Sequence, residues 1–179
     1  MKTSDKSRRL FIGSSLALGA GALLYFNKTK PKKILMFKNQ VQILLHSSYY
    51  LFPHSKLGPG AIDLSISSYL AQVLKDERIL EEDRGYFLKG ATWLEESAYE
   101  EYNKSFLNLN NSEKEELLQT VSKYKWGKNF IYTSLSYIFE ALLSSPVYGS
   151  NKDGLGWKWL EHSAGFPQPK SRDEIYYEV

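Results

Sequence analysis

The sequence predicts an all-α fold in which about five helices pack as an irregular bundle. Apolar residues recur at helical spacing in successive stretches of residues 34–143. The alternation of apolar and polar residues that is typical of a half-buried strand is nowhere sustained. Gly, Pro and polar residues separate the stretches, as expected where helices end. A long irregular segment containing Gly and Trp is expected to follow the last helix.

The first two helices are expected on either side of a loop. Residues 34–52 place their apolar side chains on one helical face, and Pro53 stops this helix because it cannot continue the hydrogen-bond ladder. The following residues, PHSKLGPGAID, predict a loop, with Pro-Gly as a turn signal. Asp63 or Ser65 can then cap the second helix, whose apolar positions extend to Val73.

The third and fourth helices carry clearer boundary signals. A helix is expected from about Glu81 to Tyr102, and Gly90 in its middle indicates close packing, because Gly is a poor helix former. The stretch NNSEKEELLQTVSKY contains a capping box in which Ser112 is followed three residues later by Glu115. The fourth helix is therefore expected to begin at this box.

The fifth helix is expected from Asn129 to Leu143, because Trp126 and Gly127 break the preceding pattern. From Ser144 onward the sequence is rich in Gly, Pro and polar residues, and we expect it to be irregular. No internal repeat and no heptad array is visible.

The charge of the chain divides it into two parts. Residues 1–33 carry eight Lys and Arg and one Asp, whereas residues 34–179 carry fifteen Lys and Arg and nineteen Asp and Glu. We therefore expect an N-terminal basic segment, residues 1–33, and one helical domain, residues 34–179. The mildly acidic domain lacks the basic stripe of a nucleic-acid-binding protein, so no nucleic-acid partner is expected.

The N-terminal segment has the layout of an export signal. Its run SRRLFIG resembles the twin-arginine translocation signal through Arg8, Arg9 and Phe11, and an apolar stretch, Leu10 to Phe26, follows. We expect the twin-arginine translocase to recognise this signal. The protein is then expected in the periplasm, associated with the inner membrane. Whether the segment is cleaved or kept as an anchor helix stays open, because the stretch is only marginally long enough to span a bilayer.

Catalytic motifs are not visible in the sequence. The chain has no Cys, which excludes thiol nucleophiles and Cys-ligated iron–sulfur clusters. Its three histidines are isolated in sequence, and none belongs to a zinc-protease or nucleotide-binding motif. No catalytic, cofactor-binding or metal-binding residue is therefore assigned to this chain, and whether it forms part of an enzyme cannot be decided from these residues.

The stretch SPVYGSNKDGLGWKWL, residues 145–160, is the strongest candidate for a binding site. Its Gly, Asn and Asp spacing partly resembles a calcium loop, but a single carboxylate gives poor affinity for a hard dication. Its glycines permit sharp turns that would hold aromatic side chains rigidly, as suits an interface anchor. Trp157 can equally close the core of this chain, and both interpretations stay open.

The same stretch resembles the signature of the gluconate 2-dehydrogenase subunit 3 family. The matching residues, which we take as the candidate partner interface, are Pro146, Tyr148, Gly149, Asn151, Asp153, Gly156 and Trp157. Ser150 departs from the usual second Gly. A weaker resemblance lies in the earlier loop, through Pro53, Gly60, Ala61 and Asp63.

The resemblance implies a non-catalytic small subunit of a membrane-associated dehydrogenase. The implied partner is a large FAD-containing subunit of the glucose–methanol–choline type, and a cytochrome c subunit with haem often takes the electrons onward. The small subunit would escort the folded flavoprotein through twin-arginine export and remain bound to it. The alternative from a different class is a membrane-tethered periplasmic adaptor module of another complex.

Overall fold

The computed structural model describes residues 36–165 and 168–171. The chain separates into two compact units, Met1–Asn39 and Gln40–Val179. Only residues 36–39 of the first unit are described, and they are helical. The expected twin-arginine signal, with Arg8, Arg9 and Phe11, therefore lies outside the described residues. None of the helices within the described ranges is long and apolar enough to cross a membrane.

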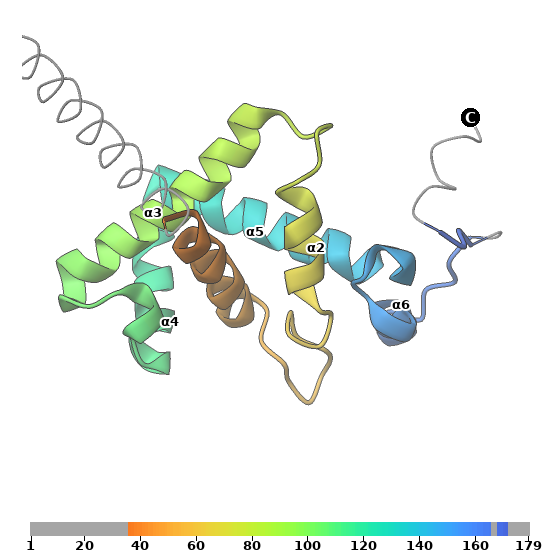
Figure 1. The fold of residues 1–179 in the computed structure, drawn as a ribbon. Helices are drawn as coiled ribbons and strands as arrows, with labels where there is room; N and C mark the ends of the chain where they lie inside the picture. Colours follow the sequence, from red (N-terminus) through yellow and green to blue (C-terminus); the bar gives the residue numbers. More distant parts are fainter. Residues whose placement is uncertain (1–35, 166–167, 172–179) are drawn as a thin grey trace, which may run out of the picture. The chain divides into compact units, whose positions relative to one another are not determined.

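The described part of the chain is all-α, as the sequence predicts (Figure 1). A first helix covers residues 36–51 and ends before Pro53, and no strand occurs in the described ranges. An isolated bridge joins Ser55 to Gly58 in the loop that follows. The α-helices after this loop are α2 (Ile66–Val73), α3 (Glu81–Tyr102), α4 (Asn111–Val121), α5 (Lys125–Leu143) and α6 (Leu155–Trp159), and the 3₁₀ turns are η1 (Phe106–Asn108), η2 (Pro146–Tyr148) and η3 (Lys152–Gly154).

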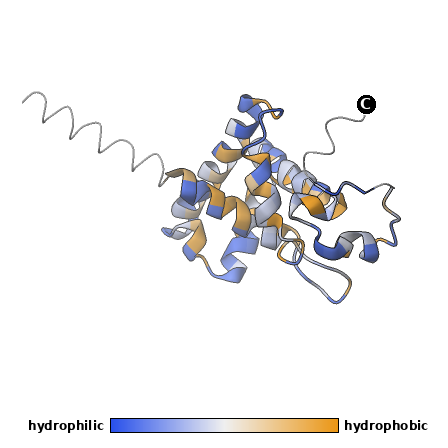
Figure 2. Cartoon of the chain, turned by 45° about the vertical axis from the view of Figure 1, so that its right-hand side comes forward, coloured by the Kyte–Doolittle hydropathy of each residue, from blue (hydrophilic) through white to orange (hydrophobic). Residues whose placement is uncertain are grey.

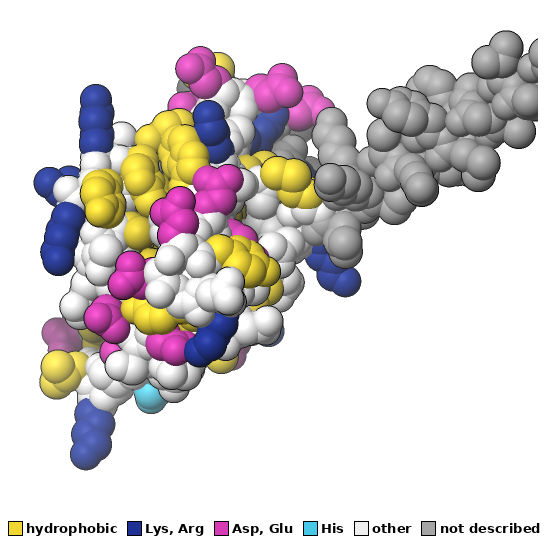
Figure 3. All heavy atoms as spheres, turned by 90° about the vertical axis from the view of Figure 1, so that its left-hand side faces the viewer, with side chains coloured by type: hydrophobic (Ala, Val, Ile, Leu, Met, Phe, Trp, Pro, Cys, Tyr) yellow, Lys and Arg dark blue, Asp and Glu magenta, His cyan; other side chains and the backbone are white. Residues whose placement is uncertain are grey.

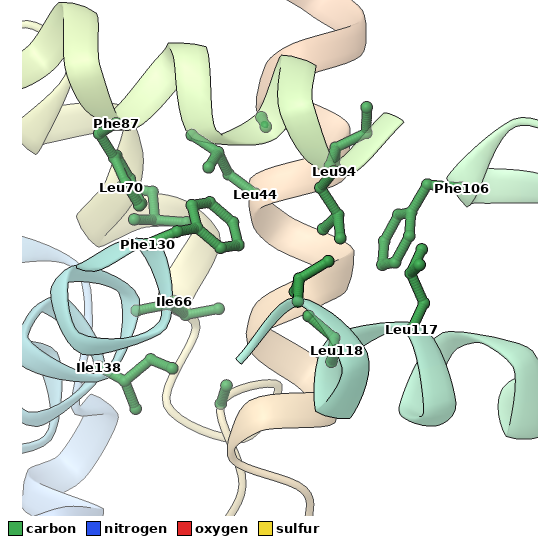
Figure 4. Close-up of a cluster of buried hydrophobic side chains, with 14 of the residues drawn as sticks. Leu44, Ile66, Leu70, Phe87, Leu94, Phe106, Leu117, Leu118, Phe130 and Ile138 are labelled. Carbon is green, nitrogen blue, oxygen red and sulfur yellow. The ribbon is translucent and has the colours of Figure 1, made fainter. Parts of the chain in front are cut away.

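Helix α5 is the element around which the others pack, because it contacts α2, α3, α4 and α6. The helices carry hydrophobic residues along one side and hydrophilic residues along the other (Figure 2). The hydrophobic sides meet in one core, where Leu44 of the first helix, Leu94 of α3 and Phe130 of α5 are almost completely buried (Figure 4). Burial of apolar surface is the main force that holds such a bundle together.

Gly90 of α3 lies where α3 packs on α5, as its position in the sequence predicts. A Cβ atom at Gly90 would collide with the ring of Phe130. Gly85, in the same helix, has nothing within 4 Å of the corresponding position. Close packing therefore requires a glycine at position 90 but not at position 85, although helix propensity alone does not distinguish the two.

Two predicted helix starts are wrong. Helix α4 begins after Asn110, whose side chain accepts a hydrogen bond from the Glu113 amide, and the Glu113 carboxylate accepts one from the Asn110 amide, both at 2.9 Å. The predicted box of Ser112 and Glu115 is not used. Helix α5 begins at Lys125, before the predicted Asn129, because Gly127 lets the chain lie against the backbone of Val121.

The start of α2 also differs from the prediction. Ser65 precedes the helix with φ 54° and makes no side-chain cap hydrogen bond. The Asp63 carboxylate instead accepts hydrogen bonds from the Gly60 amide, at 2.7 Å, and from the His54 ring, at 2.8 Å. The Gly60 amide, and secondly His54, lower the pKa of Asp63. Asp63 therefore closes the 53–63 loop and does not cap the helix.

Candidate partner-binding site

The loop between α5 and α6 is organised around the side chain of Asn151, which has no solvent exposure. Its Nδ2 donates to the Ser144 carbonyl at 2.9 Å, and its Oδ1 accepts from the Gly156 amide at 2.7 Å. Its own amide donates to the Leu64 carbonyl at 3.1 Å. Because all three bonds reach different segments, the side chain and the backbone amide of this one buried residue hold the loop, the end of α5 and the residues before α2 together. Asn151 has φ 49°, in the left-handed region that Asn tolerates better than most residues.

Close packing against the end of α5 explains other residues of the motif. A Cβ atom at Gly156 would collide with the Leu142 carbonyl. Gly149 has φ 86°, which favours Gly. Ser150 is completely buried, and its hydroxyl lies 2.7 Å from the Ser144 hydroxyl. The departure from the family signature at Ser150 is therefore accommodated by a hydrogen bond inside the loop.

The structure brings all seven predicted interface residues into this loop, but it places them differently with respect to solvent. Asn151 and Gly156 are buried and serve the loop itself. Asp153 is exposed, at φ 55°. The rest, Pro146, Tyr148, Gly149 and Trp157, are half-buried. Only part of the predicted set is thus available to a partner in this conformation.

Both tryptophans of the motif are tied to neighbouring backbone. The indole Nε1 of Trp157 donates to the Leu143 carbonyl at 2.8 Å. The indole Nε1 of Trp159 donates to the Leu57 carbonyl at 2.7 Å, and its ring lies over Gly58, where a Cβ atom would collide with it. Trp157 therefore packs on its own chain, and Trp159 joins α6 to the 53–63 loop.

Trp159 belongs to a group of apolar side chains that are exposed. Leu57 is 87% exposed, Phe139 48% and Trp159 40%. Phe52 lies between the last two rings, with centroid distances of 5.9 Å to Phe139 and 6.3 Å to Trp159. We call this surface the apolar face and define it by Phe52, Leu57, Phe139, Leu143, Trp159 and Leu160.

The apolar face was missed by sequence reasoning, although a signal was present. The sequence places Ile138, Phe139 and Leu142 among the apolar residues of the fifth helix without saying which of them face the core. In the structure Ile138 and Leu142 are buried, whereas Phe139 and Leu143 are exposed. Consecutive apolar pairs at 138–139 and 142–143 cannot all face one core, so they indicate a helix that is apolar on a second side. Such a side, when it is left exposed, is typical of an interaction surface.

Chemical groups for catalysis do not gather near this surface. Within residues 36–165 and 168–171, no three His, Cys, Asp or Glu side chains lie close enough to hold a metal ion. His54 pairs with Asp63, and this contact closes the 53–63 loop, because the same carboxylate also accepts a hydrogen bond from the Gly60 amide. What the described residues offer is a contact surface: a rigid loop beside exposed rings.

These features define a small helical protein with a hydrogen-bonded C-terminal loop beside an exposed apolar surface. A family model described as Gluconate 2-dehydrogenase subunit 3 matches residues 38–165, which is most of the chain. The chain belongs to this family, as the motif residues predict. It is thus an accessory subunit by family, which implies a dehydrogenase partner. Comparisons with curated proteins and with solved structures give no match.

Proposed function

We propose that this chain is the non-catalytic small subunit of a periplasmic, membrane-associated dehydrogenase, and that it escorts the folded FAD subunit through twin-arginine export and then stabilises the complex. The large subunit would be of the glucose–methanol–choline type, and a third subunit would carry haem c. The observation that carries the proposal is the apolar face, which lies beside the family motif in a chain of a dehydrogenase-subunit family.

Docking of the large subunit on the apolar face is supported by its chemistry. The centres of protein interfaces are enriched in aromatic residues and depleted in charged ones. Trp159 and Phe139 are aromatic, partly exposed and held in place by an indole hydrogen bond and by ring contacts with Phe52. Side chains that are already ordered lose little conformational entropy on binding, which suits them to be interface anchors.

The escort role is supported by the sequence of the N-terminal segment. Arg8, Arg9 and Phe11 match a signal that directs folded proteins to the twin-arginine translocase. A flavoprotein must fold around FAD before export, and a partner without its own signal can travel with a subunit that has one. The small subunit would then supply the export signal and the docking surface, while the large subunit would supply the redox chemistry.

The docking proposal is tested by capture of the large subunit from cells that produce both. We expect the double variant Phe139→Ser, Leu143→Ser to capture at least about tenfold less flavin-containing partner than the wild type, because loss of two interface anchors typically costs more than 1.4 kcal/mol. Tyr132→Ser is the matched control: Tyr132 is 75% exposed, lies on the same helix and is not part of the apolar face. Undiminished capture by the double variant would show that the partner docks elsewhere. A captured partner without flavin would instead favour the adaptor function.

The escort proposal is tested separately by replacing Arg8 and Arg9 with Lys and fractionating cells. We expect the FAD subunit to remain in the cytoplasm, since the translocase reads the arginine pair itself. Arrival of the FAD subunit in the periplasm at the wild-type level would refute the escort role without touching the docking proposal.

A further inference from the structure

A cavity of about 930 Å³ lies between α2, the residues that follow α2, the end of α5 and the loop after it. Its wall includes Tyr69 and Gln72 of α2, Ser144 at the end of α5, and Tyr148 of the family motif. Cavities of this size are typical of binding sites. Tyr148 is a motif residue outside the apolar face, so docking on that face alone gives it no contact with the large subunit.

The walls of the cavity are joined by hydrogen bonds. The Tyr69 hydroxyl donates to a carboxylate oxygen of Glu140 at 2.8 Å, which connects α2 to α5. The side-chain amide of Gln72 donates to the Tyr148 carbonyl, which connects α2 to the family motif. Because both bonds link different elements, the cavity is already formed. A group that enters it does not have to order the walls first, which favours binding.

The charged side chains of the cavity leave one carboxylate without a counter-ion. Those that line it are Lys75, Asp76, Glu77, Arg78 and Glu140. The Arg78 Nε donates to both carboxylate oxygens of Asp76, at 2.9 and 3.2 Å, so these two charges neutralise each other. Lys75 and Glu77 are exposed and carry opposite charges. Within the described residues Glu140 makes no ion pair, so one negative charge remains in excess.

This negative charge acts on the Tyr69 hydroxyl. Burial raises the pKa of Tyr69, and the hydrogen bond to Glu140 and the charge of Glu140 raise it further. The charge of Asp76 acts in the same direction. The Tyr69 hydroxyl therefore stays protonated and donates to Glu140. A neutral donor orients the carboxylate without cancelling its charge, so Glu140 is a fixed anion in the wall of a cavity.

The cavity adjoins the apolar face along α5. Glu140 and Ser144 line the cavity, whereas Phe139 and Leu143, each one residue earlier, belong to the apolar face. Consecutive residues of an α-helix are rotated by about 100°, so the two pairs form neighbouring stripes along one helix. A partner that covers the apolar face therefore comes within reach of the Glu140 carboxylate.

We propose that the cavity receives an arginine side chain of the large subunit, which pairs with Glu140. The guanidinium group is planar, and two of its N–H groups can bind one carboxylate side by side. Guanidinium groups also stack on aromatic rings, and Tyr69 and Tyr148 both line the cavity. Arg is enriched in protein interfaces, whereas Lys is depleted. An arginine in a cavity beside apolar anchors is the arrangement expected of an interface hot spot.

This inference rests on the proposed function and deepens it, because it names the chemistry that would hold the large subunit beside the apolar face. The two can be told apart. Capture that depends on Phe139 and Leu143 but not on Glu140 would remove the inference and leave the proposed function standing. Failure of the wild-type chain to capture a flavin-containing partner would remove both.

Replacement of the Glu140 carboxylate tests the ion pair. Glu140→Gln keeps the shape of the side chain and an oxygen that can accept from Tyr69, but it removes the charge. We expect it to capture at least about tenfold less flavin-containing partner than the wild type, because the partner's charge is left unpaired in the interface. Glu77→Gln is the matched control: it removes the same charge from an exposed residue of the same cavity and should change capture less than about twofold.

A photo-cross-linker identifies the group that enters the cavity. p-Azidophenylalanine in place of Lys75, an exposed residue of the cavity wall, should cross-link to the large subunit in cells that produce both. A chymotryptic digest should place the attachment point near an arginine. The same probe in place of Tyr99, which is 52% exposed on α3, is the control and should give no such product. On the side of the molecule that carries α3 and α4, acidic and basic side chains are interspersed (Figure 3), so an arginine is not expected to be held there.

The arginine found in this way then allows a double-mutant cycle. Its replacement by Gln should weaken capture about as much as Glu140→Gln does, and the double variant should lose less than the product of the two single losses, because either change alone already breaks the pair. Three results would overturn the inference: undiminished capture by Glu140→Gln, a probe in place of Lys75 that gives no product or one without a nearby arginine, and single losses that multiply in full. Equal loss in Glu77→Gln would also overturn it, by tracing the effect to net charge.

Discussion

The side-chain oxygen of Asn151 accepts a hydrogen bond from the Gly156 amide at 2.7 Å, with neither residue open to solvent. The side-chain nitrogen of Asn151 donates to the Ser144 carbonyl, so one side chain satisfies backbone groups on both sides of the loop. An unpaired buried polar group costs more than a hydrogen bond contributes, which makes this side chain hard to replace.

Asn151→Ala should lower the free energy of unfolding by about 2–4 kcal/mol, because it leaves the Gly156 amide and the Ser144 carbonyl unpaired and forces Ala into the left-handed region. Urea unfolding followed by circular dichroism measures the change. Asn129→Ala, at an exposed position of α5, is the control and should stay within about 0.5 kcal/mol of the wild type. A small effect at position 151 would mean that the loop is not held through this amide.

Gly90→Ala and Gly85→Ala should shift stability in opposite directions, although both replace a glycine of α3. At Gly90 the new methyl group must displace the Phe130 ring in the core, at a cost of about 1–3 kcal/mol. At Gly85 it meets open space and should stabilise the protein by about 0.5–1 kcal/mol. Thermal unfolding of the two variants side by side is the measurement, and a stabilised Gly90→Ala variant would contradict the packing of α3 on α5.

Asn110→Ala should cost about 1 kcal/mol, because it removes the side-chain cap of α4. Ser112→Ala should cost less than about 0.5 kcal/mol, because this side chain makes no cap. The pair separates the observed helix start from the one that the sequence pattern favoured. Equal losses in both variants would argue for a helix start two residues later.

The Asp63 carboxylate should make stability depend on pH in the acid range. Its pKa is lowered below the ordinary value of 3.8, so it is protonated less easily in the folded chain than in the unfolded one. Its contribution is therefore fully present above the unfolded pKa and is lost as the pH falls through the folded pKa. We expect Asp63→Asn to be less stable than the wild type at pH 7 by about 1 kcal/mol, and this difference to shrink as the pH falls well below 4.

Urea unfolding of the Asp63→Asn variant at a series of pH values measures this effect. Glu77→Gln, which removes a charge from an exposed position, is the control and should show no comparable change in the difference. A difference that stays constant down to pH 2 would show that the carboxylate charge does not hold the loop.

Much of the fold could be predicted from the sequence, because helical periodicity and helix-ending residues act locally. Helix α3 has the predicted bounds, Glu81–Tyr102, and the first helix ends just before Pro53. The predicted start of α4 at the box of Ser112 and Glu115 was wrong, because Asn110 and Glu113 fit a capping box as well. The buried Leu109, directly before the box that is used, places the chain at Asn110. That choice depends on tertiary packing and has no local signal.

The sequence predicted which residues form the candidate site, but not which of their side chains are exposed to a partner. The motif residues were located correctly in sequence, yet whether Asn151 faces a partner or the core depends on contacts with Leu64 and Ser144, which lie in other segments. The exposure of Phe139 was not predicted, because a helical pattern cannot say which of two apolar sides is covered. Exposure is decided by the neighbours of a helix, and these are known only from the fold.

The hydrogen bond from Trp159 to Leu57 joins residues that are 102 positions apart. During synthesis Leu57 leaves the ribosome long before Trp159, at a rate of about 5–20 residues per second. Before Asn151 and Trp159 are synthesised, the Leu64 and Leu57 carbonyls lack the hydrogen-bond donors that these residues supply. A chain that ends before Trp159 would lack this hydrogen bond, so the 53–63 loop is joined to α6 only after nearly nine-tenths of the chain has been made.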